Sequence, residues 1–497
     1  MMLSSLELIA TCIVIPFSFV ILRHLLLSAT KDEPPFVKGP VPFLGSALAY
    51  LRNPQQFLHG LQKKYGPIFT VYIAGERMTF IADPKIGNRQ VLNNRNSLSF
   101  LHFQQKYSQS FFGYTKAVAM DLDFQQKLIH QINTVMSSKP FLAEITKTIR
   151  TTYLGLIDNS RYAKCNGEVI DLYQFCRYNM YYSSAQALFG PGFPFEEIYQ
   201  PYLCFEDDLP KFARGYPRFL NSKGYKEQKK VLDELGSYVM DPSRIAQSSA
   251  LIRSLYDICM ASTHKSPADV AGFFFSVLLA SKSNSIPAAF WTLANIVADT
   301  GIKAEIEEII PKYYVAEKDD FDWNELQKVP LIISCFKETL RLNGNGISTR
   351  QVMQDLTLRV GNPSDDNAKD MRLRAGSAVL LPMSMVHWNP DVYPNPMKWI
   401  GRRYLEENEG VLVHGGDKLH AYTPWGGGPY ICPGRHLAFE EAVIQIVYVL
   451  NRFDIEHIED VPTFVIDDRY GTGVFRPAKG YHVKLTRRKT PLVHVAQ

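Results

Sequence analysis

The 497-residue sequence lacks the marks of several common protein classes. Its seven cysteines are scattered and never form a C-x-x-C pair, which argues against a disulfide scaffold and a structural zinc site. The net charge is +5 and no long basic run occurs, so we expect no nucleic-acid partner. No G-x-G-x-x-G motif follows a predicted strand, which disfavours a doubly wound dinucleotide-binding fold. Hydrophobic residues make up 46% of the chain, and this predicts a large globular core.

The amino-terminal segment lacks charge over a long stretch. No charged residue occurs from Leu8 to Leu22, and with its flanks about 20 residues are available, the length that a membrane-spanning helix needs. Basic residues follow this segment, so the bulk of the protein is expected in the cytosol. A cleavable signal peptide and a buried core helix are the alternatives. We expect a membrane anchor at 1–30, a proline-rich hinge at 31–45 and one catalytic domain at 46–497.

Residue periodicity predicts a mainly helical protein with small β-sheets near both ends. An amphipathic helix is expected at 55–65, followed by strands at 68–73 and 78–82 joined as a hairpin. Helical patterns then dominate the chain up to about residue 345. Three further short strands are expected at 356–360, 371–374 and 378–381.

Cys432 differs from the other cysteines because glycines and prolines surround it in Trp425-Gly426-Gly427-Gly428-Pro429-Tyr430-Ile431-Cys432-Pro433-Gly434. Such a run forms a tight loop whose backbone N–H groups can point at the sulfur. A helix is predicted from His436 to Leu450, and its amino end faces the loop, where it favours a negative sulfur. A lone thiolate in this setting suits a metal ligand, and haem iron is the leading candidate.

A long apolar helix is predicted at 268–298, with the polar interruption Ser281-Lys282-Ser283-Asn284-Ser285 followed by Pro287. The proline cannot donate a hydrogen bond to the carbonyl of Ser283, so the helix should kink there. One interpretation is a bent core helix whose serines bond to their own backbone. Next to a haem, the same kink would form a pocket for bound oxygen and its protons.

The cysteine loop, the kinked helix and a third element together resemble the cytochrome P-450 superfamily of haem-thiolate enzymes. The third element is Glu338-Thr339-Leu340-Arg341, the family's E-x-x-R, on a helix expected at 331–342. Trp399-Ile400-Gly401-Arg402-Arg403-Tyr404 is similar to the family's P-E-R-F segment. Arg403 would complete a buried cluster with Glu338 and Arg341 that supports the cysteine loop. The resemblance implies the P-450 fold, mainly α with small sheets, preceded by one N-terminal transmembrane helix.

The resemblance also implies haem b as the cofactor, with Cys432 as the axial ligand. Trp425 takes the place of the family's phenylalanine, which packs against the thiolate loop, and Gly428 matches the glycine of the pattern. Arg350 matches the arginine that usually binds a haem propionate, a role suited to a bidentate guanidinium.

Departures from the family pattern concern the propionate contacts and the oxygen pocket. Tyr430 stands where the family usually has an arginine two residues before the cysteine. The family's W-x-x-x-R pattern is not recognisable, so the second propionate ligand is placed at Lys127, with His130 as the alternative. In the kinked helix the usual acid becomes Ser283 and the usual threonine becomes Asn284, and we predict these two as catalytic positions.

This combination resembles the branch that holds the sterol 7-alpha- and 12-alpha-hydroxylases and prostacyclin synthase, and fungal biosynthetic enzymes share it. It implies a monooxygenase that oxidises a sterol, triterpenoid or related natural product with O2 and electrons from an NADPH-cytochrome reductase. The expected location is the endoplasmic reticulum membrane, single-pass, with a cytosolic catalytic domain. A haem-thiolate isomerase or dehydratase, acting without external electrons, is the alternative function, and a haem sensor is a third. Substrate contacts are expected at 100–114, 274–279 and 346–348.

Overall fold

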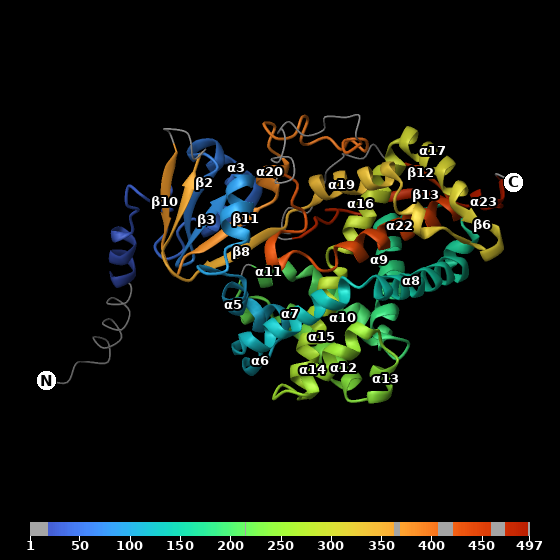
Figure 1. The fold of residues 1–497 in the computed structure, drawn as a ribbon, viewed down its shortest axis with the longest axis horizontal. Coiled ribbons are helices and arrows are strands. Elements are labelled where there is room, and N and C mark those ends of the chain that lie inside the picture. Colours follow the sequence, from blue (N-terminus) through green and yellow to red (C-terminus); the bar gives the residue numbers. More distant parts are fainter. Residues whose placement is uncertain (1–17, 214, 362–367, 406–420, 459–472, 496–497) are drawn as a thin grey trace. The chain divides into compact units, whose positions relative to one another are not determined.

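The computed structural model describes most of the chain (Figure 1). The described residues are 18–213, 215–361, 368–405, 421–458 and 473–495. Their contacts divide the chain into two compact units: unit 1 is 1–103, 347–386 and 427–429, and unit 2 is 104–346, 387–426 and 430–497. The protein is mainly helical with small β-sheets, and this part of the predicted fold class is confirmed.

Unit 1 is built on a six-stranded sheet in the order β1-β2-β3-β11-β8-β4. The predicted hairpin consists of β2 (Ile68–Ile73) and β3 (Glu76–Ile81), which pair antiparallel. Its turn residues Ala74 and Gly75 both have positive φ, 48° and 87°, as the twist of a two-residue hairpin turn requires. Next to it, β11 (Ala378–Pro382) runs parallel to β3 and antiparallel to β8 (Ile347–Val352).

The remaining elements of unit 1 cover or extend this sheet. Buried Phe69, Val71 and Phe80 of the hairpin share a hydrophobic cluster with Leu58 of α3. The elements of unit 1 besides β2, β3, β8 and β11 are β1 (Phe36–Val37), α2 (Ala47–Arg52), α3 (Pro54–Tyr65), α4 (Pro84–Ile86), β4 (Leu98–Ser99), β9 (Leu356–Val360) and β10 (Lys369–Leu373). Two helices contain residues of both units, α5 (Phe100–Phe112) and α20 (Ser384–His387).

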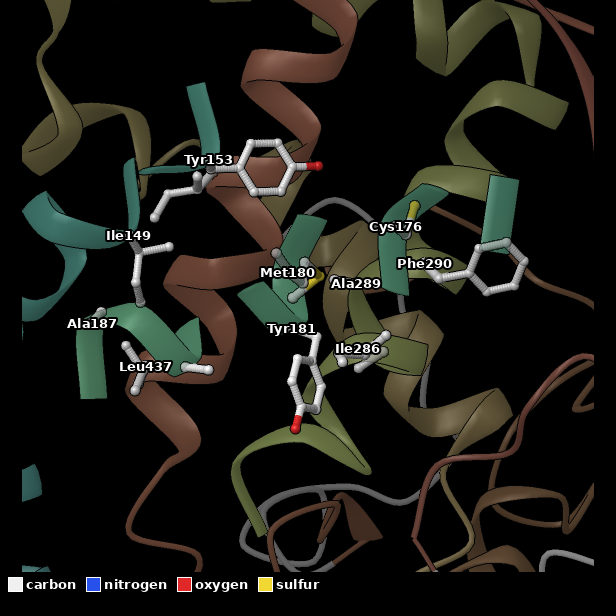
Figure 2. Packing of buried hydrophobic residues seen from close by; sticks show 14 of the residues in the cluster. Ile149, Tyr153, Cys176, Met180, Tyr181, Ala187, Ile286, Ala289, Phe290 and Leu437 are labelled. Carbon is white, nitrogen blue, oxygen red and sulfur yellow. The ribbon is translucent and has the colours of Figure 1, made fainter. Parts of the chain in front are cut away.

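Unit 2 is helical around a large apolar core. Its central helix, α16 (Ser285–Ala298), is buried along almost its whole length and packs against α9 (Leu172–Phe189), α19 (Pro330–Asn343) and α22 (Arg435–Arg452). Figure 2 shows side chains of this core, among them Tyr181 and Ile286. An apolar core of this kind gives the site helices a rigid base.

The other helices of unit 2 are α6 (Lys116–Met120), α7 (Leu122–Met136), α8 (Lys139–Asn159), α10 (Phe195–Asp207), α11 (Leu209–Ala213), α12 (Ser222–Val239), α13 (Pro242–Ala246), α14 (Ala250–Met260), α15 (Pro267–Lys282), α17 (Thr300–Ile309), α18 (Trp323–Leu326) and α23 (Leu492–Val495). Its strands form a three-stranded sheet, β12-β13-β5, and a pair, β6-β7. Their bounds are β5 (Asn166–Asp171), β6 (Tyr314–Val315), β7 (Asp320–Phe321), β12 (Phe453–His457) and β13 (His482–Arg487).

The predicted membrane anchor at 1–30 lies partly outside the described residues, which begin at residue 18. Residues 18–26 are helical. Across the described ranges, no helix has the length and apolar character needed to cross a membrane. The predicted hinge at 31–45 belongs to unit 1, and ion pairs of the Glu33 carboxylate with Arg77 and Arg374 connect it to the rest of that unit.

Candidate active site around Cys432

The loop before α22 holds Cys432 through its backbone. The N–H of Cys432 donates to the carbonyl of Trp425 at 2.9 Å, which closes the loop. Burial raises the pKa of the Cys432 thiol, while the backbone N–H groups of Gly434 and Arg435 and the Arg435 guanidinium oppose that rise. Arg435 also donates to the carbonyl of Cys432 at 3.0 Å. The sulfur therefore lies among hydrogen-bond donors and positive charge, the surroundings that favour a thiolate ligand.

The donor set around Cys432 consists of one sulfur with backbone N–H groups and the Arg435 guanidinium beside it. Within the part of the chain that the structure describes, no group of three or more His, Cys, Asp and Glu side chains could hold a metal ion. Cys432 would bring one thiolate ligand to an iron, and a porphyrin would supply the other ligands. Cys432 and its donors fit that group.

Aromatic packing supports the start of the loop. Trp425 stacks on Phe336 of α19 with ring centroids 6.2 Å apart, and Phe336 packs against Phe439 of α22 at 5.2 Å. Gly428 belongs to unit 1 and has φ +65°. A Cβ atom at Gly428 would lie 2.3 Å from the carbonyl oxygen of Leu92, so a side chain cannot fit there without a backbone shift.

The structure brings Glu338, Arg341 and Arg403 together. Arg341 binds the Glu338 carboxylate in bidentate fashion, at 2.7 and 2.9 Å, and Arg403 donates to the same carboxylate at 2.9 Å. The backbone N–H of Ile400 adds a further hydrogen bond at 3.0 Å. All three side chains are buried, at 0, 0 and 3% exposure. Because water does not reach these charges, they are stabilised by one another.

The two arginines extend this cluster to the chain that leads to the thiolate loop. Arg341 donates to the carbonyls of His387 and Pro396, at 2.8 and 2.6 Å, and Arg403 donates to that of Pro394 at 2.8 Å. Burial and the charge of Arg341 lower the pKa of His387 to about 3. The neutral ring of His387 accepts a hydrogen bond from the N–H of Thr423 at 3.3 Å, two residues before the loop begins.

The predicted kink is a complete interruption between α15 and α16, at Ser283 and Asn284. The side-chain oxygen of Asn284 accepts a hydrogen bond from the N–H of Val474 at 2.9 Å. A Cβ atom at Gly473 would lie 2.0 Å from that oxygen, which shows how closely the two segments approach. The Asn284 amide N–H groups are then the donors that it can offer to another partner.

The segment 473–476 is a part of the site that the sequence did not indicate. Besides its bond to Asn284, it receives the indole N–H of Trp291 on the carbonyl of Phe475 at 2.8 Å. Its backbone also bonds to Asn343 and Asn345, which end and follow the E-x-x-R helix. No sequence motif marks this segment. Only its hydrogen bonds to distant residues in the folded structure identify it as part of the site.

The predicted propionate ligands lie in different parts of the chain. Arg350 is buried on β8 of unit 1, donates to the carbonyl of Thr349 at 2.8 Å and lies 5.9 Å from the ring centroid of Phe100. Lys127 is exposed on α7 of unit 2. Tyr430 donates its phenol hydrogen to the Gln126 side chain at 3.0 Å. The roles of Arg350 and Lys127 toward a haem propionate stay predictions.

Comparison with known proteins places this site in a family. The family model described as Cytochrome P450 matches residues 34–485. The chain is 28% identical to the 7-alpha-hydroxycholest-4-en-3-one 12-alpha-hydroxylase of Oryctolagus cuniculus, over 98% of this chain and 99% of that protein. It is 28% identical to the 5-beta-cholestane-3-alpha,7-alpha-diol 12-alpha-hydroxylase of Sus scrofa, over 95% and 96%. It is 26% identical to the cholesterol 7-alpha-monooxygenase of Cricetulus griseus, over 91% and 93%. These matches confirm the predicted branch, the monooxygenase class and haem as the cofactor.

Proposed function

Because the chain belongs to the cytochrome P450 family, we propose that it hydroxylates a sterol or a related lipophilic compound with O2 and NADPH-derived electrons. The observation that carries this proposal is the half-buried Cys432, whose sulfur faces the backbone N–H groups of Gly434 and Arg435. Similarity to sterol hydroxylases along almost the whole chain supports the substrate class.

Haem b, when bound, supplies the redox chemistry that inserts one oxygen atom of O2 into a C–H bond. Cys432 would be its axial ligand, and Arg350 and Lys127 would hold its two propionates. Trp425 would keep the thiolate loop in place through its stacking on Phe336. The cluster of Glu338, Arg341 and Arg403 would fix the approach of the chain to that loop.

Part of the proposed substrate contact lies on α15, within the predicted segment 274–279. Phe274 and Phe275 of that segment are fully buried beside the rings of Phe189 and Phe205, so they support the helix from within the core. The phenol of Tyr114 donates to the Ser276 hydroxyl at 3.3 Å. This polar pair would orient a sterol through the sterol's oxygen atoms.

We place the protein at the endoplasmic reticulum membrane, anchored by residues 1–30, with the catalytic domain in the cytosol. In the described part of that segment, Phe19, Leu22, Leu25 and Leu26 are 55–72% exposed, and a lipid surface would cover such side chains. The proposed electron donor is a membrane-bound NADPH reductase, which would dock at basic residues such as Arg435 near the thiolate.

The Asn284→Ala variant should consume NADPH with about tenfold less product per NADPH than the parent protein. The change removes the amide donors and also the acceptor that holds Val474. Asn284→Asp keeps the acceptor for Val474 and serves as the matched variant. The measurement is product formed against NADPH oxidised, with peroxide release as a check. Unchanged coupling in Asn284→Ala would remove Asn284 from the mechanism.

The proposed function is tested with the full chain expressed in a microsome-forming host. We expect a hydroxylated product from 7-alpha-hydroxycholest-4-en-3-one or from cholesterol, and only when NADPH and a reductase are both present. Incorporation of labelled oxygen from O2 identifies the product as that of a monooxygenase. Turnover without NADPH or reductase would contradict the proposal and favour an isomerase.

A further inference from the structure

Asn284 precedes α16 in the position of a helix cap, yet its side chain does not cap that helix. A capping asparagine accepts a hydrogen bond from the backbone N–H of the second or third helical residue. In α16 the third residue is Pro287, which has no N–H group. The Asn284 side-chain oxygen instead accepts from the N–H of Val474, 190 residues further along the chain. The start of α16 therefore leaves this carboxamide to a distant partner.

Gly473 lets the two segments meet. It has φ +89°, a conformation that residues with side chains rarely adopt, and an added Cβ would lie 2.0 Å from Asn284 Oδ1. Within the described ranges the Asn284 amide nitrogen donates to no other residue, and Asn284 is exposed although Ser285 beside it is buried. With its oxygen held by Val474, the carboxamide keeps its two N–H donors for a ligand.

The backbone on either side of Val474 is bound to the end of the E-x-x-R helix, α19. The N–H of Asn345 donates to the carbonyl of Gly473 at 2.6 Å, and the N–H of Phe475 donates to the carbonyl of Asn343 at 2.9 Å. These bonds fix the segment at α19, and the next residue in sequence binds a different helix.

Arg476 connects the segment to α10. Its guanidinium pairs with the carboxylate of Glu206, which also accepts from Arg177 of α9 at 2.7 Å and from the phenol of Tyr202 at 3.1 Å. Arg177, Glu206 and Arg476 are buried, at 5, 2 and 5% exposure. Burial raises the pKa of Glu206, but the charges of Arg476 and Arg177 bring it below its usual value. The carboxylate is therefore ionised between two guanidinium groups.

Charge balance alone does not explain the second arginine. Arg177 is enough to neutralise Glu206, and burying a further guanidinium costs solvation free energy. Asp207 lies 3.4 Å from Arg476, but its side chain is 68% exposed and has water as a partner. Arg476 lies two residues after Val474, so its ion pair holds the chain close to the point where Val474 meets Asn284.

We propose that Gly473 and Arg476 are positioning residues for Asn284. Gly473 gives the Asn284 carboxamide the room to reach the backbone, and Arg476, bound to Glu206, keeps the N–H of Val474 where the carboxamide oxygen accepts from it. The two amide donors of Asn284 are thereby held in one orientation beside the helix interruption. The effect of this positioning on turnover rests on the proposed monooxygenase function.

Hydrogen–deuterium exchange of single amides in the full chain tests the role of Arg476. Arg476→Gln and Arg177→Gln each remove one guanidinium from the same carboxylate and leave the other in place, so they form a matched pair. We expect the Val474 N–H to exchange about tenfold faster in Arg476→Gln and at the parent rate in Arg177→Gln. Equal exchange in the two variants would overturn the role of Arg476.

The same measurement on Asn284 variants identifies the hydrogen bond. In Asn284→Ala the Val474 N–H should exchange faster, while the N–H of Phe475, which binds Asn343, should keep its rate. Asn284→Asp retains an acceptor oxygen and should keep both amides slow. A Val474 rate that Asn284→Ala does not change would overturn the contact in solution.

Gly473→Ala tests the close approach, with Gly66→Ala as its control. Gly66 has almost the same φ, +87°, but nothing lies within 4 Å of an added Cβ. Only Gly473→Ala should speed the exchange of Val474. It should also unfold at a lower temperature, and adding Asn284→Ala should raise that temperature again, because the second change removes the clashing atom. A double variant less stable than Gly473→Ala would overturn the close approach.

Turnover measurements link the positioning to the reaction. Arg476→Gln and Gly473→Ala should each give several-fold less product per NADPH than their controls, because a displaced amide donor no longer meets the reacting atoms. Faster Val474 exchange with unchanged coupling would overturn the catalytic part of the proposal. Turnover that needs no NADPH would contradict the proposed function. The exchange results require neither substrate nor NADPH, so they would still decide whether these residues position Asn284.

Discussion

Glu338→Gln is expected to lower the free energy of unfolding by about 3–5 kcal/mol and to reduce haem content strongly. The Glu338 carboxylate is wholly buried and accepts from both Arg341 and Arg403, so a neutral amide leaves two buried guanidinium groups without their counter-charge. The same arginines hold backbone carbonyls from Pro394 to Pro396, so the damage should reach the thiolate loop. Denaturant unfolding and the haem-to-protein ratio measure the two effects.

Glu305→Gln is the matched control for this change. Glu305 pairs with Arg402, the residue next to Arg403, and the side chains of Glu305 and Arg402 are well exposed, at 40% and 44%. Exposed pairs contribute about 0–1 kcal/mol, so stability and haem content should stay near those of the parent protein. Equal losses in the two variants would contradict a special role for the buried cluster.

Gly428→Ala is expected to prevent haem loading, because the change combines backbone strain with a steric clash. The residue has φ +65°, which costs a side-chain residue about 1–2 kcal/mol. The added Cβ would also lie 2.3 Å from the carbonyl oxygen of Leu92, and such overpacking adds about 1–3 kcal/mol. Because backbone atoms cannot yield as a side chain does, the loop before Cys432 should be displaced. Haem content of the purified protein measures the result.

Gly376→Ala separates the two causes. Gly376 has a similar positive φ of +79°, but nothing lies within 4 Å of an added Cβ atom. The Gly376→Ala variant should lose only about 1–2 kcal/mol of its free energy of unfolding, from backbone strain, and keep its haem. If Gly428→Ala behaves like Gly376→Ala, the close approach to Leu92 does not matter for the loop.

Much of this fold could be predicted from local sequence patterns. The hairpin of β2 and β3 was predicted from its apolar strands and turn residues, and the helices that carry Glu338 and Glu441 from apolar periodicity. The interruption at Ser283 and Asn284 was predicted as a kink, because proline removes a hydrogen-bond donor wherever the helix lies. These features depend on neighbours along the chain.

Features that depend on distant pairing were missed. The strand β8 reads Ile-Ser-Thr-Arg-Gln-Val, whose polar centre hides its place between β11 and β4. The sheet β12-β13-β5 joins segments from residue 166 to residue 487. The bond between Asn284 and Val474 has the same origin, since their positions in sequence say nothing of their contact. The burial of Lys282 was not predicted either, because a lysine is usually found at the surface.

The most direct test is the absorption spectrum of the reduced, full-length protein under carbon monoxide. With the Cys432 sulfur bonded to haem iron, the Soret band should shift to the long wavelength that is diagnostic of a thiolate ligand, and Cys432→Ser should lack that shift. A folded, haem-loaded parent protein that never shows the shift would contradict the assignment of Cys432 as the iron ligand.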